Sequence, residues 1–189
     1  CIKMGEILNI IKLRRSVRNY KPQQIVETSL ENILDAARFA PTGQNSQSWH
    51  FTAVQNSEIL EKLNVIVKKE YQNSPVELLR KRAENPDFSF YYNAPTFIIV
   101  SAPKESNLAP YDAGAALQNI FLAAYEEGIG SVWIHALTRI YDNPDVRKIL
   151  SKLGIPENHA VTGSAAIGYI EGNYPDLPPR KEGTFSIYR

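Results

Sequence analysis

The chain has 189 residues, of which 43% are hydrophobic and 22% charged, so it can bury a packed core. Its formal net charge of +1 argues against a general nucleic-acid binder, which would carry a clear basic surplus. The lone cysteine, Cys1, excludes an intrachain disulfide and a thiolate metal cluster, and it fits a reducing cytoplasm. No apolar run approaches the roughly 20 residues of a membrane helix. We therefore expect one domain, residues 1–189, in the cytoplasm, that binds neither nucleic acid nor membrane.

Two amphipathic helices are predicted before residue 41. The first has one apolar face, formed by Met4, Ile7, Leu8 and Ile11. The second should begin at a capping box made by Thr28 and Glu31 and end before Pro41. Its apolar stripe comprises Leu30, Ile33, Leu34 and Ala37.

The middle of the chain predicts two strands and two helices. Apolar and polar residues alternate over 49–53, as in a half-buried strand. Apolar residues then recur at helical spacing over 60–67, and a short charged helix is expected within 75–84. The continuous β-branched run over 95–100 is typical of a fully buried strand.

The second half predicts the longest helix, with Asp112 as its N-cap and an alanine-rich apolar face. A strand follows, and then a helix that Asn143 and Pro144 should open and Gly154 should end. A last strand is expected over 161–169. This order of elements predicts an α+β fold with a sheet between helices. The proline-rich residues 170–189 should run as an extended arm.

The segment Arg14-Arg15-Ser16-Val17-Arg18 places three guanidinium groups and a hydroxyl within five residues. Guanidinium is permanently charged and binds phosphate oxygens in a bidentate fork, so the cluster suits a phosphorylated ligand. The alternative is a solvated helix end, where basic residues meet the negative pole of the helix.

A run of small and amide residues, 41–49, follows the second helix. Amides donate and accept hydrogen bonds at once, as reading the edge of a heterocycle requires. The alternative is an ordinary turn. Together with the arginine cluster, this run indicates a site for a nucleotide-like cofactor.

The two segments together resemble the FMN-dependent nitroreductase family. They read Arg-Arg-Ser-x-Arg at 14–18 and Ala-Pro-Thr-Gly-Gln-Asn-Ser-Gln-Ser-Trp-His-Phe at 40–51. Weaker matches follow in order to Pro179-Arg180-Lys181, so the resemblance covers nearly the whole chain. It implies a three-layer α-β-α fold with a central mixed sheet. It also implies a homodimer with FMN at the subunit interface, and an arm, 170–189, that crosses to the partner.

The resemblance also implies which residues bind FMN. Those at the phosphate and ribityl chain would be Arg14, Arg15, Ser16, Arg180 and Lys181, with Arg18 at the N1/C2 side of the ring. Those of the loop near the ring would be Pro41, Thr42, Gly43, Gln44, Asn45 and Gln47, in part from the other subunit. Those with a backbone N–H facing flavin N5 would be Trp133, Ile134 and His135. A solvated charged tail is the alternative for Arg180 and Lys181.

The implied activity is a ping-pong hydride transfer from NAD(P)H through flavin N5 to a nitroaromatic, quinone or similar small acceptor. The flavin carries this chemistry, so no side chain is expected as nucleophile or acid–base pair. No metal site is expected, because His50 and His159 lack ligand spacing. His135 is either a proton donor on the substrate side or a cap at a strand end.

Three further features keep alternatives open. The aromatic residues over 88–92 form either a flap above the flavin or part of the core. Arg80-Lys81-Arg82 is expected to be a solvated helix face. The family's flavin-pyrimidine contact after the first strand has no assigned residue. For the whole protein, the alternatives are a flavin-binding or FMN-storage protein, a reductive dehalogenase, an enone reductase or a phosphate-ligand binding module.

Overall fold

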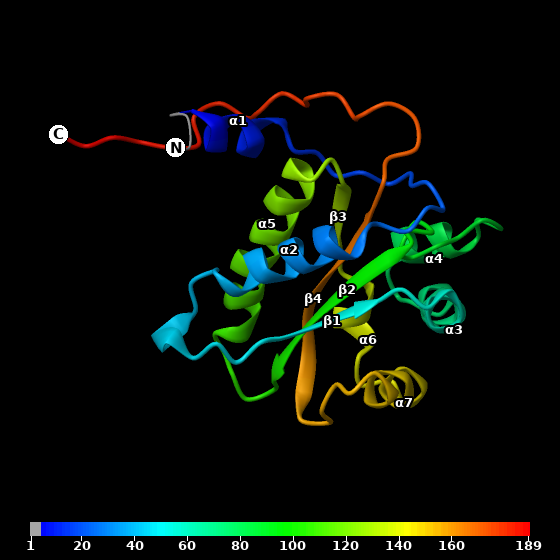
Figure 1. Cartoon of the computed structure of the whole chain (residues 1–189). Helices are drawn as coiled ribbons and strands as arrows, with labels where there is room; N and C mark the ends of the chain where they lie inside the picture. The colour runs from blue at the N-terminus through cyan, green and yellow to red at the C-terminus, as the bar shows by residue number, and fades with distance from the viewer. Residues whose placement is uncertain (1–4) are drawn as a thin grey trace.

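The computed structural model describes residues 5–189, so Met4 of the first predicted helix lies outside the described part (Figure 1). The helices are α1 (Glu6–Leu13), α2 (Glu27–Arg38), α3 (Ser57–Gln72), α4 (Glu77–Ala83), α5 (Ala109–Glu126), α6 (Ala136–Ile140), α7 (Pro144–Lys152) and the 3-10 turn η1 (Gly43–Asn45). The strands are β1 (His50–Val54), β2 (Thr96–Pro103), β3 (Gly130–Ile134) and β4 (His159–Gly168). Every helix and strand predicted from periodicity is present.

The strands form one sheet in the order β1-β2-β4-β3, and each neighbouring pair is antiparallel. The central pair runs from Thr96 opposite Ile167 to Val100 opposite Gly163, where a bulge shifts the register. The resemblance implied a mixed sheet, with both parallel and antiparallel pairs. Among residues 5–189, the parallel pairing is one isolated bridge between Ser16 and Ser131.

Helices cover both faces of the sheet, as the three-layer prediction requires (Figure 1). Successive side chains of a strand point to opposite faces, so β2 supplies both layers. Ile98 and Val100 pack in the cluster that includes α2 and α5. Phe97 and Ile99 pack in the cluster that includes α3, α6 and α7. Burial on both sides explains why β2 is apolar at consecutive positions instead of alternating.

Two predicted helix starts are wrong. Helix α2 begins at Glu27 after Val26, and no side chain caps it, so Thr28 lies inside the helix. Helix α5 begins at Ala109, one turn before Asp112. The Asp112 carboxylate instead accepts a hydrogen bond from the Gly43 backbone N–H at 3.0 Å. At α7 the prediction is confirmed, because Asn143 Oδ1 accepts from the Asp145 and Val146 N–H groups.

The chain after β4 carries no helix or named strand through residue 189. Ile170 bridges to Tyr20, and the arm then passes beside α1 and extends away from the layers (Figure 1). None of the α1 residues is buried, and its apolar side chains Ile7, Leu8, Ile11 and Leu13 are exposed. Within residues 5–189, no helix is both long and apolar enough to cross a bilayer.

Candidate functional site

The arginine segment is fixed along the outer edge of β3. Helix α1 ends at Leu13, and the Val17 N–H donates to the Ser131 carbonyl at 3.0 Å. Val17 is 1% exposed and packs so closely on Gly130 that a Cβ there would lie 2.9 Å from Val17 Cβ. Only glycine leaves room for this approach. Residues 14–18 therefore have a defined position on the sheet.

The Arg14 side chain lies on an aromatic ring, and one of its own nitrogen atoms has no hydrogen-bond partner among the described residues. Its guanidinium lies 5.7 Å from the centroid of the Phe121 ring. Its Nε is buried and has no hydrogen-bond partner among the described residues. Burial lowers the Arg14 pKa, and the like charges of Arg15 and Arg180 lower it further against the opposing effect of Tyr174. An anion beside Arg14 would relieve both penalties.

Arg15 makes hydrogen bonds to the backbone at the end of α1. It is buried, and its guanidinium donates to the Arg14 carbonyl and, at 2.7 Å, to the Lys12 carbonyl. These carbonyls lie at the C-terminal end of α1, where a cation is favourable. Arg15 therefore joins α1 to the site, and its contact with a phosphate stays a prediction.

A pocket of about 460 Å³ opens over this segment. Its cationic lining residues are Arg14, Arg15, Arg18 and Arg180, with Ser16 beside them and Asp176 as the acidic residue. We call these five basic and hydroxyl residues the arginine clamp. Lys181 is exposed and is not part of this lining.

Tyr174 attaches the arm to the clamp, which sequence reasoning missed. Its hydroxyl accepts a hydrogen bond from the Arg15 N–H at 2.7 Å. Its ring packs edge-on against Tyr125 at 5.7 Å between centroids. The available signal was one aromatic residue just before the proline-rich stretch of the arm. This contact explains how Arg180 reaches the clamp.

The end of β3 lies next to the clamp on the same side of the sheet. Trp133 is 38% exposed, and its ring packs edge-on against Phe121 at 6.4 Å. Ile134 is buried, and His135 flanks the start of α6 without capping it. Partial burial and the charge of Arg139 lower the His135 pKa. This shift disfavours the protonated form of His135. Trp133 and Phe121 form an aromatic surface that leads from Arg14 to the end of β3.

The amide-rich loop is not at this pocket. Gly43 is bonded to Asp112 in the first turn of α5, whereas Arg14 packs on Phe121 nine residues later. That separation is roughly 13 Å along the helix axis. Figure 1 shows the loop and the segment after α1 at different ends of the molecule. Gln44, Asn45 and Gln47 are exposed and have left-handed backbones, with φ of 55°, 53° and 46°.

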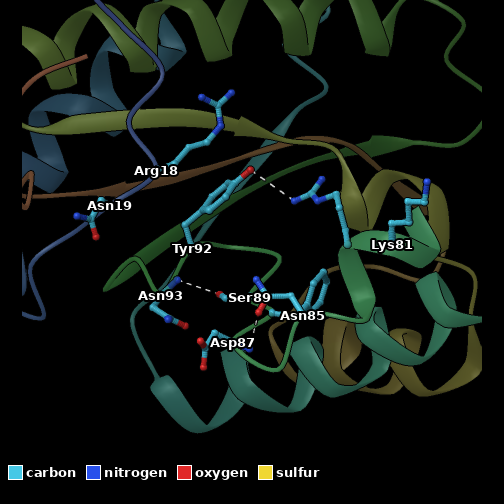
Figure 2. A pocket seen from close by; sticks show the side chains of 10 residues that line it. Arg18, Asn19, Lys81, Asn85, Asp87, Ser89, Tyr92 and Asn93 are labelled. Carbon is cyan, nitrogen blue, oxygen red and sulfur yellow. Dashed lines mark hydrogen bonds between the residues drawn. The ribbon is translucent and has the colours of Figure 1, made fainter. Parts of the chain in front are cut away.

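A second pocket adjoins the first and shares Arg18 with it (Figure 2). Of the aromatic residues over 88–92, Phe88, Phe90 and Tyr91 are buried in the core and Tyr92 packs against it, while Phe88 and Tyr92 also line this pocket. Lys81 and Arg82 line it too, and both are exposed, as expected for a solvated helix face. Among residues 5–189, no group of three or more metal-ligating side chains is assembled.

The three-layer fold and the clamp define an α+β protein with an anion site beside an aromatic surface, and comparison with known proteins gives its class. The model of the Nitroreductase family matches residues 11–169, so the chain belongs to this family. A protein of Archaeoglobus fulgidus, grouped by name with NADH dehydrogenases and NAD(P)H nitroreductases, is 35% identical over 88% of this chain and 86% of its own length.

Solved structures agree with this assignment. A Bacteroides fragilis nitroreductase with bound FMN is 42% identical and has a TM-score of 0.92, covering 97% of this chain and 99% of its own. A Desulfitobacterium hafniense nitroreductase with bound FMN is 25% identical with a TM-score of 0.89, covering 98% and 100%. The predicted three-layer α+β fold is thereby confirmed.

Proposed function

We propose that this chain is an FMN-dependent oxidoreductase that takes a hydride from NAD(P)H and passes it to a nitroaromatic, quinone or similar small acceptor. The observation that carries the proposal is the arginine clamp with the partnerless, buried Arg14 Nε, adjoining the exposed aromatic surface at Trp133. Family membership and FMN-bound neighbours support it. We expect the protein to act in the cytoplasm, consistent with its single cysteine.

The clamp fits the phosphate of FMN. Arg14 and Arg180 offer charge-assisted donors, and the Ser16 hydroxyl offers a third group. Arg18 would then face the N1/C2 side of the ring, where a cation stabilises negative charge. Trp133, Ile134 and His135 would lie at the N5 edge. When bound, the flavin supplies the two-electron chemistry, and these residues hold and orient it.

The reaction needs no protein nucleophile. For a nitro group, one hydride from NAD(P)H and one proton convert the nitro group to a nitroso group, and one oxygen leaves as water. Burial and the charge of Arg139 lower the pKa of His135, which disfavours its protonated form, and we propose solvent as the source of the proton.

We further propose a homodimer in which each site is shared. Residues 41–47 match the family's flavin loop, but one chain holds this loop about 13 Å along α5 from Arg14. A second subunit can bring its loop to the clamp. Exposed apolar side chains on α1, at Phe39 and on the arm at Phe185 and Ile187 supply surface that such a partner would cover.

The first test is a visible absorption spectrum, followed by anaerobic addition of NADH and NADPH. We expect a yellow protein that releases FMN on denaturation and is bleached by a nicotinamide nucleotide. A yellow protein that neither nucleotide bleaches would favour flavin storage. A colourless protein that takes up no FMN would favour a phosphate-ligand binding module. Product analysis with nitroaromatic, quinone, enone and halogenated acceptors would separate a nitroreductase from an enone reductase or a dehalogenase.

Changing Arg14 should release the cofactor. Arg14→Ala removes a charge-assisted phosphate contact, and we expect FMN binding to weaken about 10- to 100-fold. The measurement is a fluorescence titration of apoprotein with FMN. Arg38→Ala, at an exposed surface pair with Asp35, is the matched control and should bind like the unchanged protein. Equal FMN affinity for both variants would contradict the phosphate assignment.

A further inference from the structure

The amide loop, residues 42–47 between α2 and β1, has a strained backbone. Gln44, Asn45 and Gln47 are left-handed, with φ of 55°, 53° and 46°, and their side chains are exposed. Such backbones are uncommon outside glycine and are retained where the surrounding structure enforces them, often at binding sites. Because these side chains are exposed, their own packing does not enforce the shape of the loop, and another part of the molecule has to do so.

Among residues 5–189, one hydrogen bond ties this loop to another element. Within the loop, the Asn45 N–H donates to the Thr42 carbonyl at 3.0 Å. Toward the rest of the chain, the Gly43 N–H donates to Asp112 Oδ1, also at 3.0 Å. Beside this bond, Leu108 packs so closely on Gly43 that a Cβ at position 43 would overlap it. Asp112 is therefore the polar attachment of the loop to the start of α5 (Figure 1).

The burial of Asp112 is not explained by the stability of its helix. Asp112 lies in the first turn of α5 and is 9% exposed, and its Oδ2 is buried without a hydrogen-bond partner among the described residues. Taking a carboxylate out of water without partners for both oxygens costs free energy. An exposed acidic residue in a first turn, such as Asp145 in α7, gains the interaction with the helix dipole without that cost. What burial adds at Asp112 is the contact with Gly43.

The loop and the arginine clamp lie at separate points of α5. Asp112 holds the loop in the first turn, whereas Arg14 packs on Phe121, about 13 Å further along the helix axis. In the dimer proposed above, the loop meets the cofactor of the other subunit. A loop that is ordered before binding loses less conformational entropy when the ligand arrives. A residue that fixes the loop would therefore raise FMN affinity without contacting FMN.

We propose that Asp112 is a positioning residue for the cofactor site. It fixes the amide loop of one subunit in the shape that meets the flavin bound at the arginine clamp of the other subunit. The inference rests on the proposed function and on its shared site. Asp112 acts through Gly43 and takes no part in the hydride transfer.

The first test is a fluorescence titration of apoprotein with FMN. For Asp112→Ala we expect the affinity to fall about tenfold, because the loop must then be ordered by the ligand. Asp112→Asn keeps an oxygen that can accept from the Gly43 N–H, so its affinity should stay within about threefold of the unchanged protein. Asp145→Ala is the matched control, since it removes an exposed acidic residue from the first turn of α7.

Two results of this titration would overturn the proposal. One is an affinity of Asp112→Ala equal to that of the Asp145→Ala control. The other is a loss in Asp112→Asn as large as that in Asp112→Ala, which would assign the effect to the charge and not to the bond with Gly43.

Subunit mixing shows on which side of the shared site Asp112 acts, which general damage to the fold would not reproduce. Co-refolded in equal amounts with Arg14→Ala, Asp112→Ala should give about a quarter of the sites with unchanged FMN affinity, because its clamp is intact and the partner supplies an intact loop. Co-refolded with Asn45→Ala it should give none, because both chains then carry an altered loop. The reverse pattern, or recovery in neither mixture, contradicts the proposal.

Amide hydrogen exchange of the apoprotein gives a readout without cofactor. We expect the peptide that contains residues 42–47 to exchange faster in Asp112→Ala than in the unchanged protein, and at the unchanged rate in Asp112→Asn. Equal exchange in Asp112→Ala and the unchanged protein would show that Asp112 does not fix the loop. If the unchanged protein takes up no FMN, the proposed function fails, and the exchange measurement still decides the role of Asp112 in the loop.

Discussion

Arg14 and Arg15 are adjacent in the sequence, and their guanidinium groups face different surroundings. The Arg15 guanidinium donates to two carbonyls at the end of α1, whereas Arg14 lies on Phe121 with a buried Nε that has no partner among residues 5–189. A buried polar group without a partner is costly, so the structure distinguishes the arginine with a partnerless buried donor, Arg14, from the one that joins α1 to the following segment, Arg15.

A histidine at the edge of the core predicts how stability depends on pH. His159 Nδ1 lies 3.1 Å from Ser101 Oγ, and burial, with the charges of His50 and Arg147, lowers its pKa below 6.5. The unfolded chain therefore binds the proton more readily, so stability is full above pH 6.5 and falls as the pH drops toward the lowered pKa.

The measurement is the melting temperature at pH 7.5 and pH 5.5. His159→Gln removes the titrating group, and we expect this variant to lose less melting temperature on acidification than the unchanged protein. Equal losses in the two proteins would show that His159 does not contribute to acid destabilisation.

At the scale of elements, a side chain caps the free N–H groups at the start of some helices and not of others. Asn143 does so at α7, and it also donates to Glu70 Oε1 at 3.0 Å. Thr28 does not, because α2 begins before it. Residues 28–31 have the composition of a capping box, but the N-cap position of α2 is occupied by Val26, whose side chain cannot accept a hydrogen bond.

This difference gives a paired prediction. Asn143→Ala should lower the free energy of unfolding by about 1 kcal/mol, since an N-cap and a side-chain contact are lost. Thr28→Ala should leave it unchanged or raise it by a few tenths of a kcal/mol, because alanine is the better helix former at an exposed position. Urea denaturation of both variants checks this, and a larger cost for Thr28→Ala would contradict the observed start of α2.

At the scale of the whole molecule, the separation of the clamp from the amide loop is the main argument for a shared site. Each chain carries both parts, about 13 Å apart along α5, so a symmetric pair would contain two complete sites. The exposed apolar side chains of α1 and the arm are consistent with such a pair.

Subunit mixing tests this arrangement. Arg14→Ala and Asn45→Ala should each lower FMN binding when alone. Co-refolded in equal amounts, half of the dimers would be mixed, each with one intact and one doubly altered site, so about a quarter of the sites should recover FMN binding. Recovery is measured as tightly bound flavin after gel filtration. If the mixture binds no more FMN than the separate variants, the site lies within one chain.

Local patterns predicted the elements because the hydrophobic period of a helix or a strand is set by its own backbone. The apolar run at 95–100 and the cap at Asn143 follow from neighbouring residues alone. Asp112 could not be assigned in this way, because its partner, Gly43, is distant in the sequence. Tyr174 was missed for the same reason, since its role depends on contacts made only after folding.

The sequence by itself determined the layer architecture, the family and the concentration of arginine side chains at residues 14–18, since these depend on side-chain chemistry and local spacing. Only the tertiary structure decided which arginine lacks a partner, where the arm is attached, and that the amide loop lies apart from the clamp in one chain. The physical reason is that burial and hydrogen-bond satisfaction are properties of the folded surroundings and not of the residue.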